Sequence, residues 1–131
     1  MLFRSGWSVL HHAAQGGRKV IIEKLLSLEL DIDSRDNDGS TPLMIAASAG
    51  QPDAFHFLLG RGSDHTLKDN NDRSPLHYAA QGDREVIIEQ LLSLGLDVDS
   101  MDRAGETPLM MSLRVGKTVA LKYLFSKGVR S

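Results

Sequence analysis

The segment from Leu30 to Leu43, LDIDSRDNDGSTPL, concentrates the side chains best suited to binding a metal ion. It holds four aspartates within eight residues, followed by Gly39. A helix–loop–helix calcium site needs oxygen ligands at loop places one, three and five, glycine at six and a bidentate glutamate at twelve. With Gly39 in the sixth place, the twelfth falls on Ile45, and Thr41-Pro42 would start a helix inside the loop. The residues therefore favour a turn, in which aspartates hydrogen-bond the nearby backbone, over a calcium site.

Two histidine arrangements are the next candidates for chemistry. His11 and His12 are adjacent, and neighbouring helical side chains point about 100° apart, so they make a poor metal site. Ser8, His11 and Asp31 are the types of a hydrolytic triad, but no strand–turn–helix nucleophile elbow accompanies them. The chain has no cysteine and no glycine-rich phosphate loop. We therefore expect no enzymatic activity, no cofactor and no metal site.

Composition limits the possible partners. The 131 residues are 41% apolar and 24% charged, which indicates one soluble globular domain. Nucleic-acid binding usually requires a clearly basic face, and the net charge of −2 does not indicate one. The charge is uneven along the chain, because residues 107–131 hold five bases and no acid. No apolar run approaches the roughly 20 residues that span a bilayer, and no long apolar signal segment opens the chain. We expect no nucleic-acid binding, no membrane insertion and a cytoplasmic or nuclear location.

The elements that carry these residues recur along the chain. Four leucines are spaced by 33 residues, and a similar phrase surrounds each of them. The leucines are Leu10, Leu43, Leu76 and Leu109, within SVLHHAA, TPLMIAA, SPLHYAA and TPLMMSL. An aspartate precedes the last three leucines by seven residues, at Asp36, Asp69 and Asp102. The whole chain is thus built from one repeated unit.

Each period predicts two short helices and a turn. A serine or threonine followed by proline marks the start of a first helix, because the hydroxyl caps it and proline suits the first helical position. These pairs are Thr41-Pro42, Ser74-Pro75 and Thr107-Pro108. Gly17, Gly50 and Gly116 end the first helices, and a second helix closes near Gly62, Gly95 or Gly128. Because helices this short are marginal alone, they must stack on one another, as in a solenoid.

The period, the TPLH-like phrase, the Ala-Ala pair and the Val-Ile-Ile…Leu-Leu helix resemble the ankyrin repeat. The resemblance covers essentially residues 1–131 as a single domain, with repeats at about 3–35, 36–68, 69–101 and 102–131. It implies an all-α solenoid of stacked helix-turn-helix units joined by β-hairpin-like finger loops. It also implies that His11 and His77 are structural, each ring tying a helix start to the neighbouring turn.

The chain departs from the family pattern at several places. Glu29 stands where glycine ends the other second helices, and Asp72 replaces the finger glycine, so both are expected in left-handed geometry. Ser112-Leu113 replaces the alanine pair, so the last repeat should pack differently.

Two repeat types alternate along the chain. Residues 10–34 and 76–100 differ at six of 25 places, and the other two repeats share TPLM. Neither end resembles a polar capping repeat, which suggests a fragment of a longer array. The competing interpretation is a complete small protein whose ends, Met1-Leu-Phe3 and Tyr123-Leu-Phe125, are covered by self-association. We therefore expect either a monomer or weak self-association through the uncapped ends.

The resemblance places partner binding on the concave side, formed by finger tips and first helices. The resemblance implies that the exposed residues there are Trp7, Arg35, Asp38, Ser40, Lys68, Asn70, Asn71, Arg73, Gln81, Met101, Arg103, Glu106 and Arg114. Tryptophan and arginine are enriched in interface hot spots, which favours Trp7, Arg73 and Arg103 as anchors. Two simpler interpretations remain: Trp7 covers the first repeat, and the polar finger residues are solvated turns.

The function expected on this basis is a non-catalytic protein–protein interaction scaffold that binds a partner peptide or domain. The alternative is a structural or self-associating repeat segment with no dedicated ligand groove. An ion-binding repeat protein is the third possibility considered.

Overall fold

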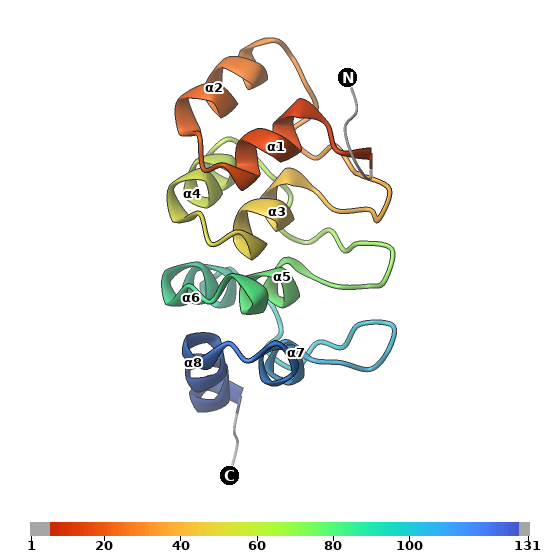
Figure 1. Cartoon of the computed structure of the whole chain (residues 1–131), viewed down its shortest axis with the longest axis vertical. Helices are drawn as coiled ribbons and strands as arrows, with labels where there is room; N and C mark the ends of the chain where they lie inside the picture. The colour runs from red at the N-terminus through yellow and green to blue at the C-terminus, as the bar shows by residue number, and fades with distance from the viewer. Residues whose placement is uncertain (1–5, 129–131) are drawn as a thin grey trace.

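The computed structural model of the chain describes residues 6–128, and within this range it contains eight α-helices in four pairs. We call the first helix of each pair inner and the second outer. The inner helices are α1 (Val9–Gln15), α3 (Pro42–Ser48), α5 (Pro75–Gly82) and α7 (Pro108–Val115). The outer helices are α2 (Lys19–Ser27), α4 (Pro52–Gly60), α6 (Glu85–Ser93) and α8 (Thr118–Gly128). The pairs stack along the long axis, with α1–α2 and α7–α8 at the two ends (Figure 1), which confirms the all-α solenoid.

Each inner helix begins directly after a serine or threonine whose hydroxyl accepts a main-chain amide of the first turn. The capping residues are Ser8, Thr41, Ser74 and Thr107. Proline occupies the first helical position of α3, α5 and α7, where its missing N–H removes no hydrogen bond. The predicted helix starts are confirmed.

Among residues 6–128, no helix is both long and apolar enough to cross a bilayer.

Within residues 6–128, three residues other than glycine adopt left-handed backbone geometry. Glu29 (φ 63°) and Asp72 (φ 59°) do so as predicted, and each costs on the order of 1 kcal/mol relative to glycine. The third, Asp83 (φ 57°), ends α5 where Gly17, Gly50 and Gly116 follow the other inner helices. Its carboxylate accepts the main-chain N–H of Ala120 at 2.7 Å, in the first turn of α8. The strained residue therefore caps the outer helix of the next repeat.

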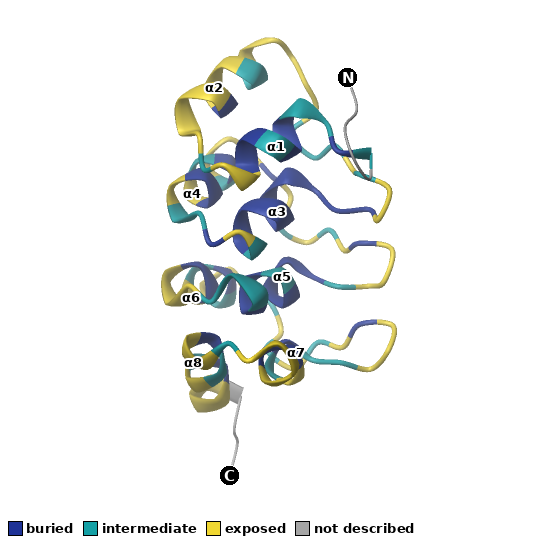
Figure 2. Ribbon diagram, viewed as in Figure 1, coloured by how far each residue is buried: buried dark blue, intermediate teal, exposed yellow. Residues whose placement is uncertain are grey.

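The core lies between successive helix pairs (Figure 2). The alanine pairs at 13–14, 46–47 and 79–80 are all buried, which lets inner helices approach closely. The tightest approach involves Gly82, where a Cβ would lie 1.9 Å from the carbonyl oxygen of Ala47 in α3. In the last repeat Ser112 is buried and bonds back to the Leu109 carbonyl, while Leu113 is 61% exposed. The predicted difference in packing is confirmed.

Three finger loops, residues 28–41, 61–74 and 94–107, project on the same side of the stack (Figure 1). Main-chain hydrogen bonds join the tip of each finger to the next. The amide of Asn70 donates to the Asp38 carbonyl at 2.9 Å, and the amide of Arg103 donates to the Asn71 carbonyl at 2.8 Å. These bonds fix the spacing of the finger tips.

Candidate functional site

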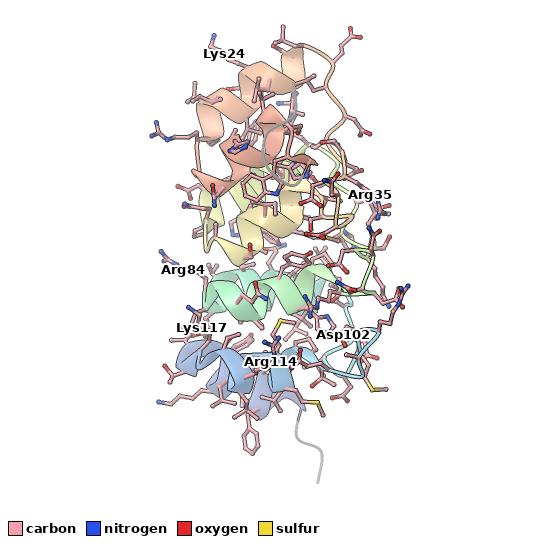
Figure 3. All side chains as sticks on the ribbon, turned by 45° about the vertical axis from the view of Figure 1, so that its right-hand side comes forward. Lys24, Arg35, Arg84, Asp102, Arg114 and Lys117 are labelled. Carbon is pink, nitrogen blue, oxygen red and sulfur yellow. The ribbon has the colours of Figure 1, made fainter. Side chains whose placement is uncertain are left out.

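The inner helices and finger loops together form one face of the molecule, here called the finger face. Arg35 and Asp102 lie on this side in Figure 3, whereas Arg84 and Lys117 lie on the opposite side, near the turns between paired helices. The family resemblance predicts partner binding on the finger face, so the geometry of this face decides which side chains are available there.

An aspartate at the same place in each repeat closes every finger. One carboxylate oxygen (Oδ1) of Asp36, Asp69 and Asp102 accepts two main-chain amides, two and four residues further along, at 2.8–2.9 Å. The amide of each aspartate in turn donates to the carbonyl four residues later, at 2.9–3.0 Å. The predicted role of the aspartates in turns is confirmed. Residues 6–128 bring together no group of three or more histidine, aspartate or glutamate side chains suited to a metal ion.

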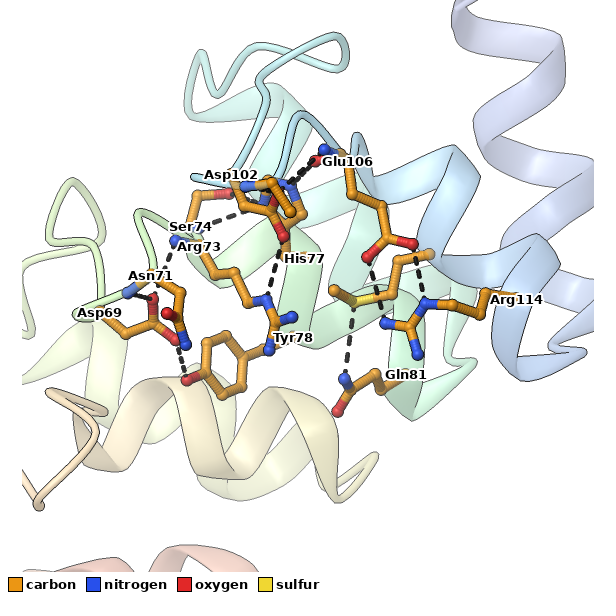
Figure 4. A network of polar contacts seen from close by, with 12 residues as sticks. Asp69, Asn71, Arg73, Ser74, His77, Tyr78, Gln81, Asp102, Glu106 and Arg114 are labelled. Carbon is orange, nitrogen blue, oxygen red and sulfur yellow. Dashed lines mark hydrogen bonds and ion pairs between the residues drawn. The ribbon is translucent and has the colours of Figure 1, made fainter.

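The second oxygen (Oδ2) of each finger aspartate receives a different side-chain donor. Trp7 Nε1 donates to Asp36 at 2.9 Å, and Arg73 Nε donates to Asp102 at 3.1 Å. The Tyr78 hydroxyl donates to Asp69 (Figure 4). It also lies 2.7 Å from the hydroxyl of Ser40. Each finger is thus bonded by a side chain from outside its own turn.

Trp7, Ser40 and Arg73 occupy one place in the repeat, being 33 residues apart. Each links to the aspartate 29 residues later, Trp7 and Arg73 directly and Ser40 through Tyr78. The side chain at this place therefore connects its own repeat to the finger of the following one. Glu106 holds the same place in the last repeat and instead pairs with Arg114 of its own inner helix, at 2.8 and 3.1 Å.

This arrangement corrects two predicted positions. Trp7 is 8% exposed and Ser40 is 3% exposed, so the prediction that both side chains are exposed was wrong. Trp7 also packs against the rings of His11 and His12, with centroids 6.1 and 4.8 Å away. The simpler interpretation of Trp7, a side chain that covers the first repeat, describes these contacts. Both side chains are covered by contacts with the following repeat, Trp7 through Asp36 and Ser40 through Tyr78.

Two carboxylates of the network, those of Asp102 and Glu106, are held in their charged forms. Burial acts to raise the pKa of Asp102, but the amides of Glu106 and Ala104 and the Arg73 guanidinium outweigh it and leave the pKa lowered. The Arg114 guanidinium lowers the pKa of Glu106. Burial, together with the bond to Asp69, raises the pKa of Tyr78, so its hydroxyl keeps its proton and donates.

His11 and His77 each join a helix start to the next finger. Nδ1 accepts the amide of the capping serine, Ser8 or Ser74, at 3.1 and 3.2 Å. Nε2 therefore carries the proton and donates to the Ser40 or Glu106 carbonyl, at 2.7 and 2.8 Å. Both rings are fully buried, and burial lowers their pKa. The structural role implied for the two histidines is confirmed.

The imagined triad does not assemble in this arrangement. Ser8 Oγ does lie 2.9 Å from His11 Nδ1, but this contact belongs to the helix cap. The other ring nitrogen binds the Ser40 carbonyl, while Asp31 accepts the amide of Asp33. A buried ring bonded on both sides has no nitrogen available to a substrate.

The other predicted partner-binding residues divide by exposure. Arg73, Gln81 and Glu106 are partly buried, and the rest are exposed: Arg35, Asp38, Lys68, Asn70, Asn71, Met101, Arg103 and Arg114. The Arg35 guanidinium donates to the Lys68 carbonyl at 2.9 Å, and the side-chain amide of Asn70 (Nδ2) donates to the Asn37 carbonyl at 3.1 Å. Gln81 reaches the sulfur of Met111 at 3.5 Å. Apart from Arg114 of α7, the exposed residues of this set lie in the finger loops.

Two residues of the network were missed from sequence. Tyr78 occupies a place held by His12, Ile45 and Met111 in the other repeats, so only repeat three has a hydroxyl there. The presence of tyrosine in this one repeat was the only feature of the sequence from which the Tyr78 hydrogen bonds could have been predicted. Asp83 replaces a glycine-like turn residue, in the same way as Glu29 and Asp72, and the same substitution argument would have identified it.

Comparison with known proteins agrees with this geometry. The family described as "Ankyrin repeats (3 copies)" matches residues 2–69 and 50–131. The chain is also similar to the ankyrin repeat protein L271 of Acanthamoeba polyphaga mimivirus, with 51% identity over 41 residues. That stretch covers 31% of this chain and 6% of the relative. Because the family match extends over nearly the whole sequence, the chain belongs to the ankyrin repeat family.

Proposed function

We propose that this chain is a non-catalytic recognition scaffold, acting in the cytoplasm or nucleus, which binds a peptide or domain of another protein along its finger face. Ankyrin repeats are in general protein–protein interaction modules, and this broader role is what family membership supplies. The finer proposal concerns the surface used and the residues that contact the partner.

The observation that carries the proposal is the fixed geometry of the fingers. Asp36, Asp69 and Asp102 each accept two amides and a side-chain donor, and main-chain bonds join neighbouring tips. A surface that is already ordered loses little conformational entropy on binding, so a few good contacts give useful affinity.

The accessible groups favour a partner rich in hydrogen-bond acceptors. Lys68 and Asn71 of the second finger and Arg103 of the third are exposed, and they present ammonium, amide and guanidinium donors. Met101 adds a 60% exposed apolar side chain beside Arg103. An extended segment carrying carboxylates and free carbonyls, with an apolar residue near Met101, would suit this row.

The proposal is tested by capturing the partner from a cell extract and then measuring its affinity for variants by titration calorimetry. Lys68→Ala combined with Arg103→Ala should weaken binding at least tenfold, because about 1.4 kcal/mol of lost contact energy gives that factor. The thermal midpoint should change little, since both side chains are exposed.

Lys24→Ala combined with Arg84→Ala is the matched control. It removes the same charge from exposed residues of α2 and of the turn before α6. Equal affinity of the two double variants would contradict the placement on the finger face. Arg73 is unsuitable for this purpose, because its loss also disturbs Asp102.

A further inference from the structure

The end of the stack formed by α7 and α8 is an exposed apolar surface, here called the C face. Met110 is 50% exposed, Leu113 61% and Phe125 57%. Leu109, Leu113, Leu121, Lys122 and Phe125 line a hollow of about 410 Å³ between the two helices. Large apolar patches of this kind mark interaction sites more often than solvated surface.

The opposite end, formed by α1 and α2, carries a second exposed apolar surface, here called the N face. Ile21 is 46% exposed on α2, and Leu25 beside it is partly exposed. The two faces lie at opposite ends of the stack in Figure 1.

The interior of the same molecule shows what covers each face. Ile87 corresponds to Ile21 two repeats later and is 0% exposed, because repeat two precedes it. Met44 corresponds to Met110 two repeats earlier and is likewise 0% exposed, because repeat three follows it. The exposed residues of the N face and of the C face therefore correspond to residues that are buried at the junction of repeats two and three.

The alternation of repeats makes the two ends complementary. Repeat one closely matches repeat three, and repeat four shares the TPLM phrase of repeat two. A repeat four followed by a repeat one would reproduce the order of repeats two and three. We propose that the C face of one copy of this chain docks on the N face of a second copy, in a head-to-tail arrangement.

Some substitutions make this junction weaker than the interior one. Leu113 replaces Ala47 and Phe125 replaces Leu59, which adds apolar area but requires wider spacing between the helices. At the interior junction between repeats two and three, His56 and Gln90 line one hollow between α4 and α6. At the proposed junction the corresponding residues are Lys122 of one copy and Lys24 of the other. Because two lysines would then face each other, added salt should strengthen the association rather than weaken it.

A head-to-tail contact uses two different surfaces, so it does not close on itself. Each added copy presents a new C face or N face, and assembly continues with rising concentration. A symmetric contact between two C faces would instead stop at a dimer. The two arrangements are therefore distinguished by whether the mass reaches a plateau.

The test uses sedimentation equilibrium of the whole chain and of two single variants. The unsubstituted chain should show a weight-average mass that rises with concentration past that of a dimer. Ile21→Asp disables the N face and Met110→Asp disables the C face, so each variant alone should remain a monomer. An equimolar mixture should form a 1:1 heterodimer and nothing larger, because each variant still offers one intact face.

Val86→Asp is the matched control, since Val86 is 45% exposed although neighbouring repeats cover both sides of α6. It should associate as the unsubstituted chain does. Circular dichroism of all three variants checks that they are folded. A concentration-independent monomer, a plateau at dimer mass, or a mixture that stays monomeric while both variants are folded would each overturn the proposal.

Discussion

Removal of the Arg73 guanidinium should weaken the attachment of the last repeat to the rest of the stack. Arg73 Nε lies 3.1 Å from Asp102 Oδ2, and the side chains are 31% and 1% exposed respectively. The substitution Arg73→Ala leaves a buried carboxylate oxygen without its donor, while the two amide bonds to Oδ1 remain. A hydrogen bond to a charged group is worth about 1.5–3 kcal/mol. Partial exposure of the arginine reduces this, so we expect a loss of about 1–2 kcal/mol.

Urea unfolding and hydrogen exchange together measure this effect. The free energy of unfolding should fall by the stated amount, and the amides of Ala104 and Glu106 should lose protection before those of earlier fingers. Stability in repeat proteins is carried by contacts between neighbours, so the change should concentrate in repeat four. Arg103→Ala, an exposed arginine on the same finger face, is the control and should stay within about 0.5 kcal/mol.

The pH dependence gives a second test of the same contact. The pKa of Asp102 is lowered in the folded state, so its contribution is present above the unfolded pKa and is lost as pH falls through the folded value. The difference between Arg73→Ala and the unsubstituted chain should therefore be full at neutral pH and shrink below about pH 4. A variant that unfolds within about 0.3 kcal/mol of the original chain, or an equal loss in Arg103→Ala, would refute the reasoning.

Three further predictions follow from single contacts, each checked by thermal or urea unfolding. Gly82→Ala should destabilise by about 2 kcal/mol or more, because its Cβ would meet the Ala47 carbonyl, whereas Gly60→Ala, with nothing within 4 Å, should be neutral or stabilising. Glu29→Gly should stabilise by up to about 1 kcal/mol by relieving left-handed strain, and a loss would contradict that. Because burial lowers the pKa of His77 from 6.5, the unfolded chain takes up its proton first, and stability should fall as pH drops below about 6.5. His77→Met should reduce this slope, and an unchanged slope would exclude His77 as its source.

The fold was predictable because its signals are local. Thr41-Pro42 caps and starts a helix within two residues, and the same pair recurs in phase with the leucines. The strained backbone of Glu29 and Asp72 was also predictable, since a repeat shows where glycine is expected. Signals of this kind depend on the residue and its immediate neighbours, not on how repeats pack.

The site was less predictable because the partner of each side chain lies in another repeat. Trp7 and Ser40 look like exposed finger residues in sequence, and only their contacts with the following repeat, to Asp36 and Tyr78, explain their burial. Trp7 and Asp36 are 29 residues apart, as are Arg73 and Asp102. This spacing can be read from the sequence, but it predicts a hydrogen bond only when the stacking of the repeats is known. Exposure of the remaining tips, such as Asn71 and Arg103, does not identify what they bind.

The alternation of two repeat types gives the junctions between repeats different chemistry. His11 and His77 donate from buried rings to the next finger, at the junctions of repeats one with two and three with four. The middle junction has the buried thioether of Met44 at that place and is joined instead through Ser40 and Tyr78 to Asp69. Protonation of a buried imidazole weakens only the junctions that contain one, so acid should loosen both ends of the stack and leave repeats two and three together. The two-repeat period thus determines which contacts depend on pH as well as the shape of the solenoid.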